Sequence, residues 1–246
     1  MTGTRQAATD HPAHARGVAN DLDERRDYHG RELEIARSGR IPGSRPEVPV
    51  GARVVLDVGC GAGQTLAALD APPETLLIGV DHELSTFEAL KVPDARFRLV
   101  GAAGEALPVA SSSCDMVICR VALPYMDVRI ALAEMARVLR AGGALWITLH
   151  PVRMIWAKLL DDVRHLRWRS TVYQCFILVN GVLLATTGRQ LTFPFGRDRR
   201  ETFQTAGGMR RALRRAGFES IAFERHERAF IVTARRSGPA GGDVVG

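Results

Sequence analysis

The stretch that decides the fold is Val54-Val55-Leu56-Asp57-Val58-Gly59-Cys60-Gly61-Ala62-Gly63-Gln64. Apolar and β-branched residues, typical of a buried strand, lead into an acid and then into three glycines at alternate positions. Dinucleotide-binding loops are spaced Gly-x-Gly-x-x-Gly, which would need a glycine where this chain has Gln64. The observed spacing lets the backbone fold around a compact ligand, and Asp57 adds a negative charge that would repel phosphate. The stretch predicts a site for a cation or an ammonium group.

The same alternation of strand and helix continues on the C-terminal side of this loop. Continuous apolar runs predict buried strands, and apolar residues at helical spacing between them predict covering helices. Because crossovers between parallel strands are right-handed, the sheet is expected to be doubly wound, a Rossmann-like α/β fold. The expected strands are 53–58, 75–80, 96–100, 114–119 and 144–149, with an antiparallel pair at 220–224 and 229–234; the expected helices are 64–69, 84–90, 127–139 (ended by Gly142-Gly143) and 205–216.

Two regions lie outside this alternation. Residues 1–48 are expected to form an N-terminal tail with a capping helix over 21–38, and residues 49–246 the main domain. The sheet is expected to have seven mostly parallel strands, and residues 151–203, which break the pattern after the fifth strand, are interpreted as an inserted lid or substrate-binding region. Its most apolar part, 172–187, contains polar residues and falls short of the roughly 20 residues that a membrane span needs.

Composition indicates an ordinary soluble domain. The 246 residues are 46% apolar and 24% charged, which excludes disordered and collagen-like classes. The four cysteines have no C-x-x-C spacing, so neither a disulfide framework nor a metal site is expected. The first thirty residues contain no apolar segment typical of a secretory signal, and a cytoplasmic location is therefore expected.

The positive charge is unevenly distributed. Residues 151–246 contain 17 Lys and Arg against 8 Asp and Glu, whereas residues 1–150 contain 16 against 19. Such an excess is consistent with a nucleic acid or a small anionic partner, or with arginines spread over solvated helix faces. The arginines at 210, 211, 214 and 215 suit the last of these interpretations best.

Asp81 follows the second expected strand. A carboxylate at this position accepts the two hydroxyls of a ribose in nucleoside-binding folds. It is also a good N-cap for the helical run that follows, and the two roles are compatible.

Five segments, in order, resemble the motifs of class I S-adenosylmethionine-dependent methyltransferases, and the nearest group is the small-molecule type that includes quinone-biosynthesis enzymes. The resemblance covers roughly residues 50–150. It implies S-adenosyl-L-methionine as the cofactor and methyl transfer as the activity. The segments are 54–63, Gly79-Val80-Asp81, 104–108, 113–117 and 134–143.

The resemblance assigns cofactor contacts residue by residue. The glycine loop would hold the methionine portion through its backbone, with Asp57 receiving the amino group. Asp81 would bind the ribose and His82 would lie against the adenine. Gly104 and Glu105 would flank the adenine edge. Ala103 departs from the family, which often has an acid there for the adenine amino group. The implied cofactor-binding set is Asp57, Gly59, Cys60, Gly61, Gly63, Asp81, His82, Gly104, Glu105 and Arg120.

Candidates for acceptor binding and catalysis come from strand ends and from the N-terminal helix. His150 ends the fifth strand and is the best general-base candidate, although the pattern is more typical of a strand-end histidine bonded to backbone. Tyr28 and His29 would close over the site or form a surface helix face, and Tyr125 would contact substrate. If Arg120 does not contact the cofactor, it would meet a substrate carboxylate or form a salt bridge. Leu123-Pro124-Tyr125 lacks the histidine that relatives often have here.

Three functions remain open from the sequence. The first is methyl transfer to a small, moderately apolar metabolite, either anionic or neutral. The second is methylation of RNA, suggested by the basic C-terminal region. The third is a cofactor-binding homologue without turnover, suggested by Ala103 and Pro124. The acceptor atom and the oligomeric state cannot be predicted, because one architecture serves many acceptors.

Overall fold

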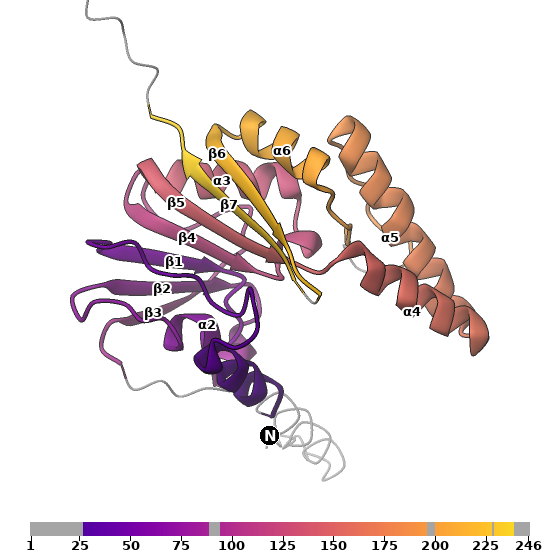
Figure 1. Cartoon of the computed structure of the whole chain (residues 1–246), viewed down its shortest axis with the longest axis horizontal. Coiled ribbons are helices and arrows are strands. Elements are labelled where there is room, and N and C mark those ends of the chain that lie inside the picture. Colours follow the sequence, from indigo (N-terminus) through magenta and orange to yellow (C-terminus); the bar gives the residue numbers. More distant parts are fainter. Residues whose placement is uncertain (1–26, 89–93, 196–199, 228, 239–246) are drawn as a thin grey trace, which may run out of the picture.

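A computed structural model describes residues 27–88, 94–195, 200–227 and 229–238. Its centre is a seven-stranded sheet in the order β3-β2-β1-β4-β5-β7-β6 (Figure 1). The first five strands pair in parallel, and β7 joins β5 and β6 in antiparallel fashion. The expected doubly wound fold with a terminal antiparallel pair is confirmed. The strands are β1 Val54–Val58, β2 Leu76–Asp81, β3 Phe97–Gly101, β4 Cys114–Arg120, β5 Leu139–Leu149, β6 Phe218–Arg225 and β7 Phe230–Arg236.

Helices cover the sheet and extend beyond it. Residues 27–38 form an N-terminal helix, and the rest of the helix expected from residue 21, like the tail before it, lies outside the described residues. The helix expected over 84–90 is instead a short 3-10 helix, and residues 89–93 lie outside the described part. The elements are α2 Gln64–Ala67, η1 Leu84–Glu88, η2 Leu123–Tyr125, α3 Val128–Val138, α4 Val152–Arg164, α5 Trp168–Thr187 and α6 Ala206–Arg215.

The boundary between α3 and β5 differs from the expectation. The helix expected over 127–139 is observed at Val128–Val138, but the strand expected from residue 144 already begins at Leu139, so both glycines belong to β5. Leu139 already pairs with Cys114 of β4, and the register then shifts before Met116 pairs with Ala144. The glycines therefore form an irregular start to the strand, where Gly142 has a φ of +75°. A glycine pair after a helical run indicates that the helix has ended. It does not indicate whether the next strand begins before or after the glycines.

Alternate side chains of the strands enter two apolar layers. Leu56 and Val58 face a layer shared with α3 and α6, in which Leu132, Met135 and Leu213 are fully buried. The opposite face of the sheet packs against α2 and the segment before β1. Both faces of the parallel strands are therefore covered, which explains why most positions in these strands are apolar.

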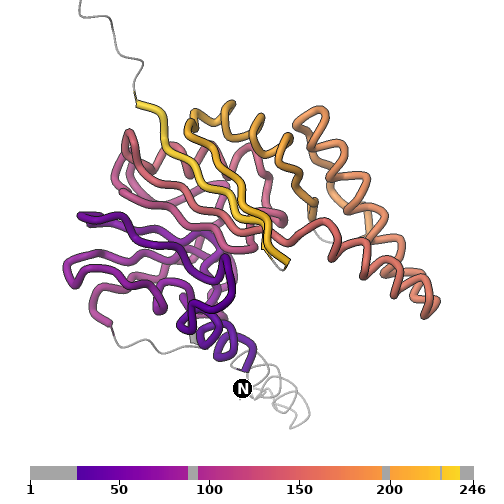
Figure 2. The backbone as a smooth tube through the Cα atoms, in the orientation of Figure 1, coloured from indigo at the N-terminus to yellow at the C-terminus, as the bar shows by residue number. Residues whose placement is uncertain are grey.

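After β5 the chain leaves the sheet as α4 and returns as α5, and the two helices project from the body of the molecule (Figures 1 and 2). The apolar part noted at 172–187 lies within a longer helix. Helix α5 has 20 residues and is, among the described residues, the one helix long and apolar enough to cross a membrane. Core helices also meet that criterion, but only 22% of the apolar window of α5 is buried. Gln174 and Asn180, which seemed to interrupt the stretch, lie on its buried side.

Candidate functional site

A large open cavity lies beyond the carboxyl ends of the parallel strands. Its volume is about 1260 Å³, above the roughly 300–1,000 Å³ of ordinary small-molecule sites. Gly59 follows β1, Asp81 ends β2, Arg120 ends β4 and His150 follows β5, and all four line this cavity. Open parallel sheets bind their ligands at this edge. The space is large enough for a nucleoside and a second small molecule together.

The glycine loop forms one wall of the cavity. Gly59 has a φ of +74°, and a Cβ there would overlap the Ala122 side chain. The Gly61 N–H donates to Oδ2 of Asp81 over 2.8 Å, which ties the loop to the end of β2. Glycine at position 59 therefore serves both the backbone turn and close packing against the segment after β4.

Asp57 lies just behind this wall, two residues before Gly59. Its side chain is 1% exposed, and within the described residues neither carboxylate oxygen has a hydrogen-bond partner. Burial raises its pKa to about 7, Arg120 opposes that shift and Asp81 adds to it. A buried carboxylate without a partner is costly, so its presence is evidence for a cationic ligand group.

Asp81 combines the two roles that the sequence left open. Its Oδ1 accepts from the Glu83 N–H over 3.0 Å, as an N-cap does, and Oδ2 holds Gly61. Each carboxylate oxygen has a further lone pair, and the residue lines the cavity. The neighbouring His82 ring lies 3.4 Å from Oδ1 and is 83% exposed at the rim.

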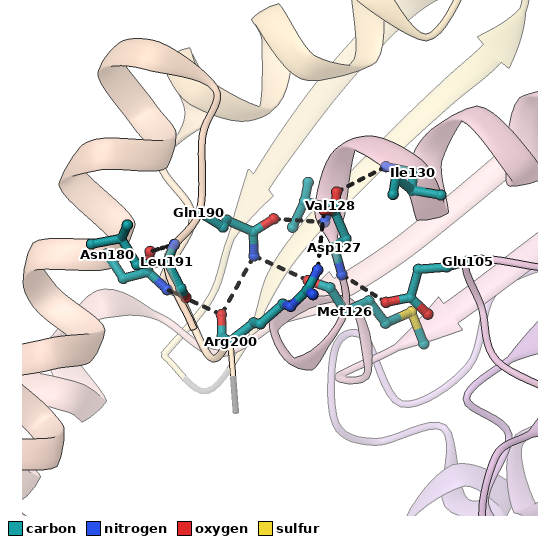
Figure 3. Close-up of polar contacts among 9 residues, drawn as sticks. All are labelled: Glu105, Met126, Asp127, Val128, Ile130, Asn180, Gln190, Leu191 and Arg200. Atoms are coloured by element: carbon teal, nitrogen blue, oxygen red, sulfur yellow. Dashed lines mark hydrogen bonds and ion pairs between the residues drawn. The ribbon is translucent and has the colours of Figure 1, made fainter. Parts of the chain in front are cut away.

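Glu105 and Gly104 line the cavity beyond β3. Glu105 Oε1 accepts from the Asp127 N–H over 2.7 Å, and Asp127 in turn caps α3. Figure 3 shows how this corner continues into the segment after α5: Gln190 donates to the Met126 carbonyl and accepts from the Val128 N–H. The adenine-edge candidates are thus joined by hydrogen bonds to the base of the α4–α5 hairpin.

The N-terminal helix covers the glycine loop. Its Tyr28, His29 and Glu32 line the cavity, and the His29 ring packs against Gly61. Glu32 forms a 2.7 Å ion pair with Arg120, whose guanidinium also donates to Thr65 over 3.0 Å. Arg120 is therefore already held by protein groups, as the salt-bridge interpretation expected.

Two further candidates have pKa values shifted by their surroundings. His150 lines the cavity, and burial lowers its pKa, so the imidazole is neutral at pH 7. Partial burial raises the pKa of Tyr125 to about 12, with the nearby Glu201 carboxylate acting in the same direction. A neutral imidazole is able to accept a proton, whereas the Tyr125 phenol keeps its own.

The cavity gathers most, but not all, of the predicted site residues. Asp57, Cys60 and Gly63 are not among the residues lining it, and the Cys60 sulfur instead packs towards Gly79 in the interior. Sequence reasoning missed several lining residues, although two carried a signal: Glu32 is one helical turn after Tyr28, and Gln64 follows the last glycine. Among the described residues, no cluster of His, Cys, Asp and Glu is arranged to hold a metal. The missed residues include Glu32, Gln64, Thr86, Met126, Arg153 and Met154.

Comparisons with known proteins agree with this geometry. Residues 56–147 match the family model described as a methyltransferase domain. This part of the chain is a class I S-adenosylmethionine-dependent methyltransferase domain. Its cofactor is S-adenosylmethionine. The human N-acetylserotonin methyltransferase, solved in complex with that cofactor, has the same fold: the TM-score is 0.54 at 13% identity, over 88% of this chain and 57% of that one.

Two curated relatives match the methyltransferase domain. The malonyl-[acyl-carrier protein] O-methyltransferase of Dechloromonas aromatica is 32% identical over 118 residues, which are 45% of this chain and 44% of that protein. The ubiquinone/menaquinone biosynthesis C-methyltransferase of Syntrophotalea carbinolica is 30% identical over 119 residues, 46% and 50% of the two chains. The chain thus matches about half the length of these relatives, and the α4–α5 hairpin lies outside the residues that the family model matches.

Proposed function

We propose that the protein transfers a methyl group from S-adenosylmethionine to a small, moderately apolar metabolite that carries an anionic group. The observation that carries this proposal is Asp57, a buried carboxylate without a partner, immediately behind a glycine loop that lines a cavity of about 1260 Å³. An ammonium group is the ligand feature that such a carboxylate lacks. A nucleoside cofactor would leave room in the cavity for an acceptor.

The residues present fit the cofactor. Ionised Asp57 would receive its ammonium group, the Gly59–Gly61 backbone its methionine portion, and the free lone pairs of Asp81 its ribose hydroxyls. His82, Gly104 and Glu105 would surround the adenine. When bound, the cofactor supplies a methyl group on a sulfonium, which is already activated for displacement. The chain's task is therefore alignment in a site that excludes water, which can supply up to roughly 7–11 kcal/mol.

The acceptor side of the cavity supports the proposed substrate class. Ile35, Met126 and Met154 provide apolar lining, and Arg120 and Arg153 carry positive charges that are paired with Glu32 and Glu227. Tyr28, His29 and Tyr125 would enclose the acceptor. If the acceptor atom is a hydroxyl oxygen, neutral His150 would take its proton as the methyl group is transferred. The names of the two curated relatives, which refer to malonyl-acyl carrier protein and to quinones, are compatible with an apolar or acidic acceptor.

The experiment that tests the proposal is incubation of the purified chain with methyl-labelled cofactor and an extract of its own cells that contains both metabolites and RNA. We expect labelled low-mass products by mass spectrometry. Label found only in RNA would instead support RNA methylation. Binding of RNA to the chain would then weaken steeply as the salt concentration rises. Tight cofactor binding with no labelled product would support the homologue without turnover.

A further inference from the structure

The turn between α4 and α5 has an unusual composition. Residues 163–169 read Val163-Arg164-His165-Leu166-Arg167-Trp168-Arg169, with three arginines and no acid. Leu166 is 87% exposed and Trp168 is 71% exposed. Asp161 and Asp162, which precede the turn, both pair with Arg167, while Arg169 lies 5.7 Å from the centre of the Trp168 ring. The tip therefore presents large apolar side chains next to basic groups.

The exposed apolar surface continues from the tip along both helices. On α4, Trp156, Leu160 and Val163 recur every three or four residues and are each about half exposed. On α5, the exposed positions fall on one side of the helix, and residues 170–188 contain no charged side chain. This surface gathers eight exposed large apolar side chains on one hairpin, whereas those of a typical soluble monomer are scattered singly. We name it the hairpin surface: Trp156, Leu160, Val163, Leu166, Trp168, Val172, Val179 and Val182.

The other side of α5 is fixed to the protein. Asn180 is fully buried and hydrogen-bonds the backbone of Leu191, Arg200 and Glu201 (Figure 3). Gly181 packs against the Phe203 ring. A helix held in this way by buried polar contacts does not leave the body to span a bilayer, so its exposed side is available at a surface.

We propose that the hairpin surface docks on a lipid bilayer that contains anionic lipids. Tryptophans and leucines beside arginines are the composition of helices that lie at the boundary between headgroups and acyl chains. The charge is complementary, since residues 151–190 contain six Lys and Arg but only two Asp. A second copy of the chain is the less favourable occupant, because Arg169 and Arg189 flank the two ends of the uncharged face. Two such faces would bring like charges together in either orientation.

The position of the hairpin gives docking a consequence for the cavity. Arg153 and Met154, in the first turn of α4, line the cavity, and the same helix reaches the tip at Arg164. Thirteen helical residues span about 20 Å, so the cavity lies within about that distance of the tip. If the proposed function holds, docking would bring the active site next to an apolar phase that concentrates apolar acceptors.

Docking is tested with the full chain and vesicles, without cofactor or acceptor. We expect sedimentation with phosphatidylcholine vesicles containing 30 mol% phosphatidylglycerol and much weaker sedimentation with phosphatidylcholine alone. Fluorescence of Trp156 and Trp168 should shift to shorter wavelength on binding and be quenched by brominated acyl chains. The double variant Arg164→Gln, Arg169→Gln should lose about fivefold in partitioning for each charge removed.

A pair of matched variants separates the hairpin surface from general stickiness. Leu166→Glu with Trp168→Glu should weaken partitioning at least tenfold at an unchanged melting temperature. Val50→Glu, at a fully exposed apolar site before β1, should have no effect. Three results would each overturn the proposal: no binding of the folded chain to the anionic vesicles, equal binding by the Leu166 and Trp168 variant, or a stable dimer in light scattering that Val179→Asp dissociates. None of these results bears on methyl transfer.

Discussion

At the scale of single residues, Asp57 couples cofactor binding to pH. Burial raises its pKa to about 7, so part of the population is protonated at neutral pH. An ammonium ligand needs the ionised form. We therefore expect the affinity for S-adenosylmethionine to weaken about tenfold for each pH unit below 7. In Asp57→Asn the affinity should be at least tenfold lower at pH 8, about 1.4 kcal/mol or more, and independent of pH. Calorimetric titrations from pH 5.5 to 8.5 measure both effects.

Asp57→Asn should weaken cofactor binding but should not lower the free energy of unfolding. The pKa of Asp57 lies above its ordinary value of 3.8, so the folded chain binds this proton more tightly than the unfolded chain. Its contribution to the free energy of unfolding is full below about pH 4 and is lost as the pH rises through about 7. Asp57→Asn removes that loss and should melt no lower than the parent at pH 8. A variant that binds cofactor normally would show that the ammonium group is held elsewhere.

His150 provides a residue-scale test of the chemistry. Its pKa is lowered by burial, which leaves the ring neutral and ready to accept a proton above about pH 6.5. For a hydroxyl acceptor, His150→Gln should lower kcat by about 10²–10⁴ and remove the acidic limb of the pH profile, while the cofactor Kd stays unchanged. His165→Gln, at the exposed end of α4, is the matched control. Full turnover in His150→Gln would exclude an essential base at this position.

At the scale of elements, the N-terminal helix is held over the glycine loop by one well-shielded ion pair. Arg120 and Glu32 are 12% and 22% exposed. Glu32→Gln removes the charge partner and should weaken the docking of this helix by about 1–2 kcal/mol. Cofactor dissociation should then be roughly five- to thirtyfold faster in stopped-flow measurements. Glu34→Gln, an exposed change on the same helix, should leave the rate as it is; equal rates in both variants would mean that the helix does not retain the cofactor.

Asn180 joins α5 to the segment that follows it, in which Arg200 pairs with Asp127 at the start of α3. Asn180→Ala would leave several buried backbone groups without their partner, and we expect a loss of about 2–4 kcal/mol, or roughly 5–10 °C in Tm. Thr186→Ala, on the exposed side of α5, should change Tm by less than about 2 °C. Thermal unfolding followed by circular dichroism compares the two. Similar melting temperatures would show that this network contributes little to holding the hairpin.

The elements that the sequence predicted well are those with continuous apolar runs. β1, β2 and β4 are buried on both faces, and this alone determines their sequence pattern. Helix α5 was missed because its periodicity has two apolar sides, one buried and one exposed, and the polar Asn180 points inward. In the site, the strand-end residues were found because parallel strands end at one edge. Glu32 and Arg153 were not, because their approach to the cavity depends on how separate helices pack.

At the scale of the whole molecule, seven of the 17 basic residues of 151–246 lie in two clusters. Three lie at the hairpin tip, and four on α6, where Arg210, Arg211, Arg214 and Arg215 are all exposed. None of the four α6 arginines is among the residues that line the cavity. The Arg210 guanidinium lies instead 4.9 Å from the centre of the Phe223 ring. An RNA bound along α6 would therefore not bring a base to the cavity without further contacts.

Replacing the four α6 arginines by glutamine tests whether this charge serves catalysis. For a small-molecule enzyme we expect unchanged kcat and cofactor Kd, because these exposed side chains do not line the cavity and salt at 0.15 M screens exposed charges. Binding to a mixed RNA pool should be weak and lost by 0.2 M salt in the parent as well. If the parent binds RNA tightly and the variant loses both that binding and its turnover, RNA is the substrate, since each phosphate contact removed lowers both the affinity and its salt dependence.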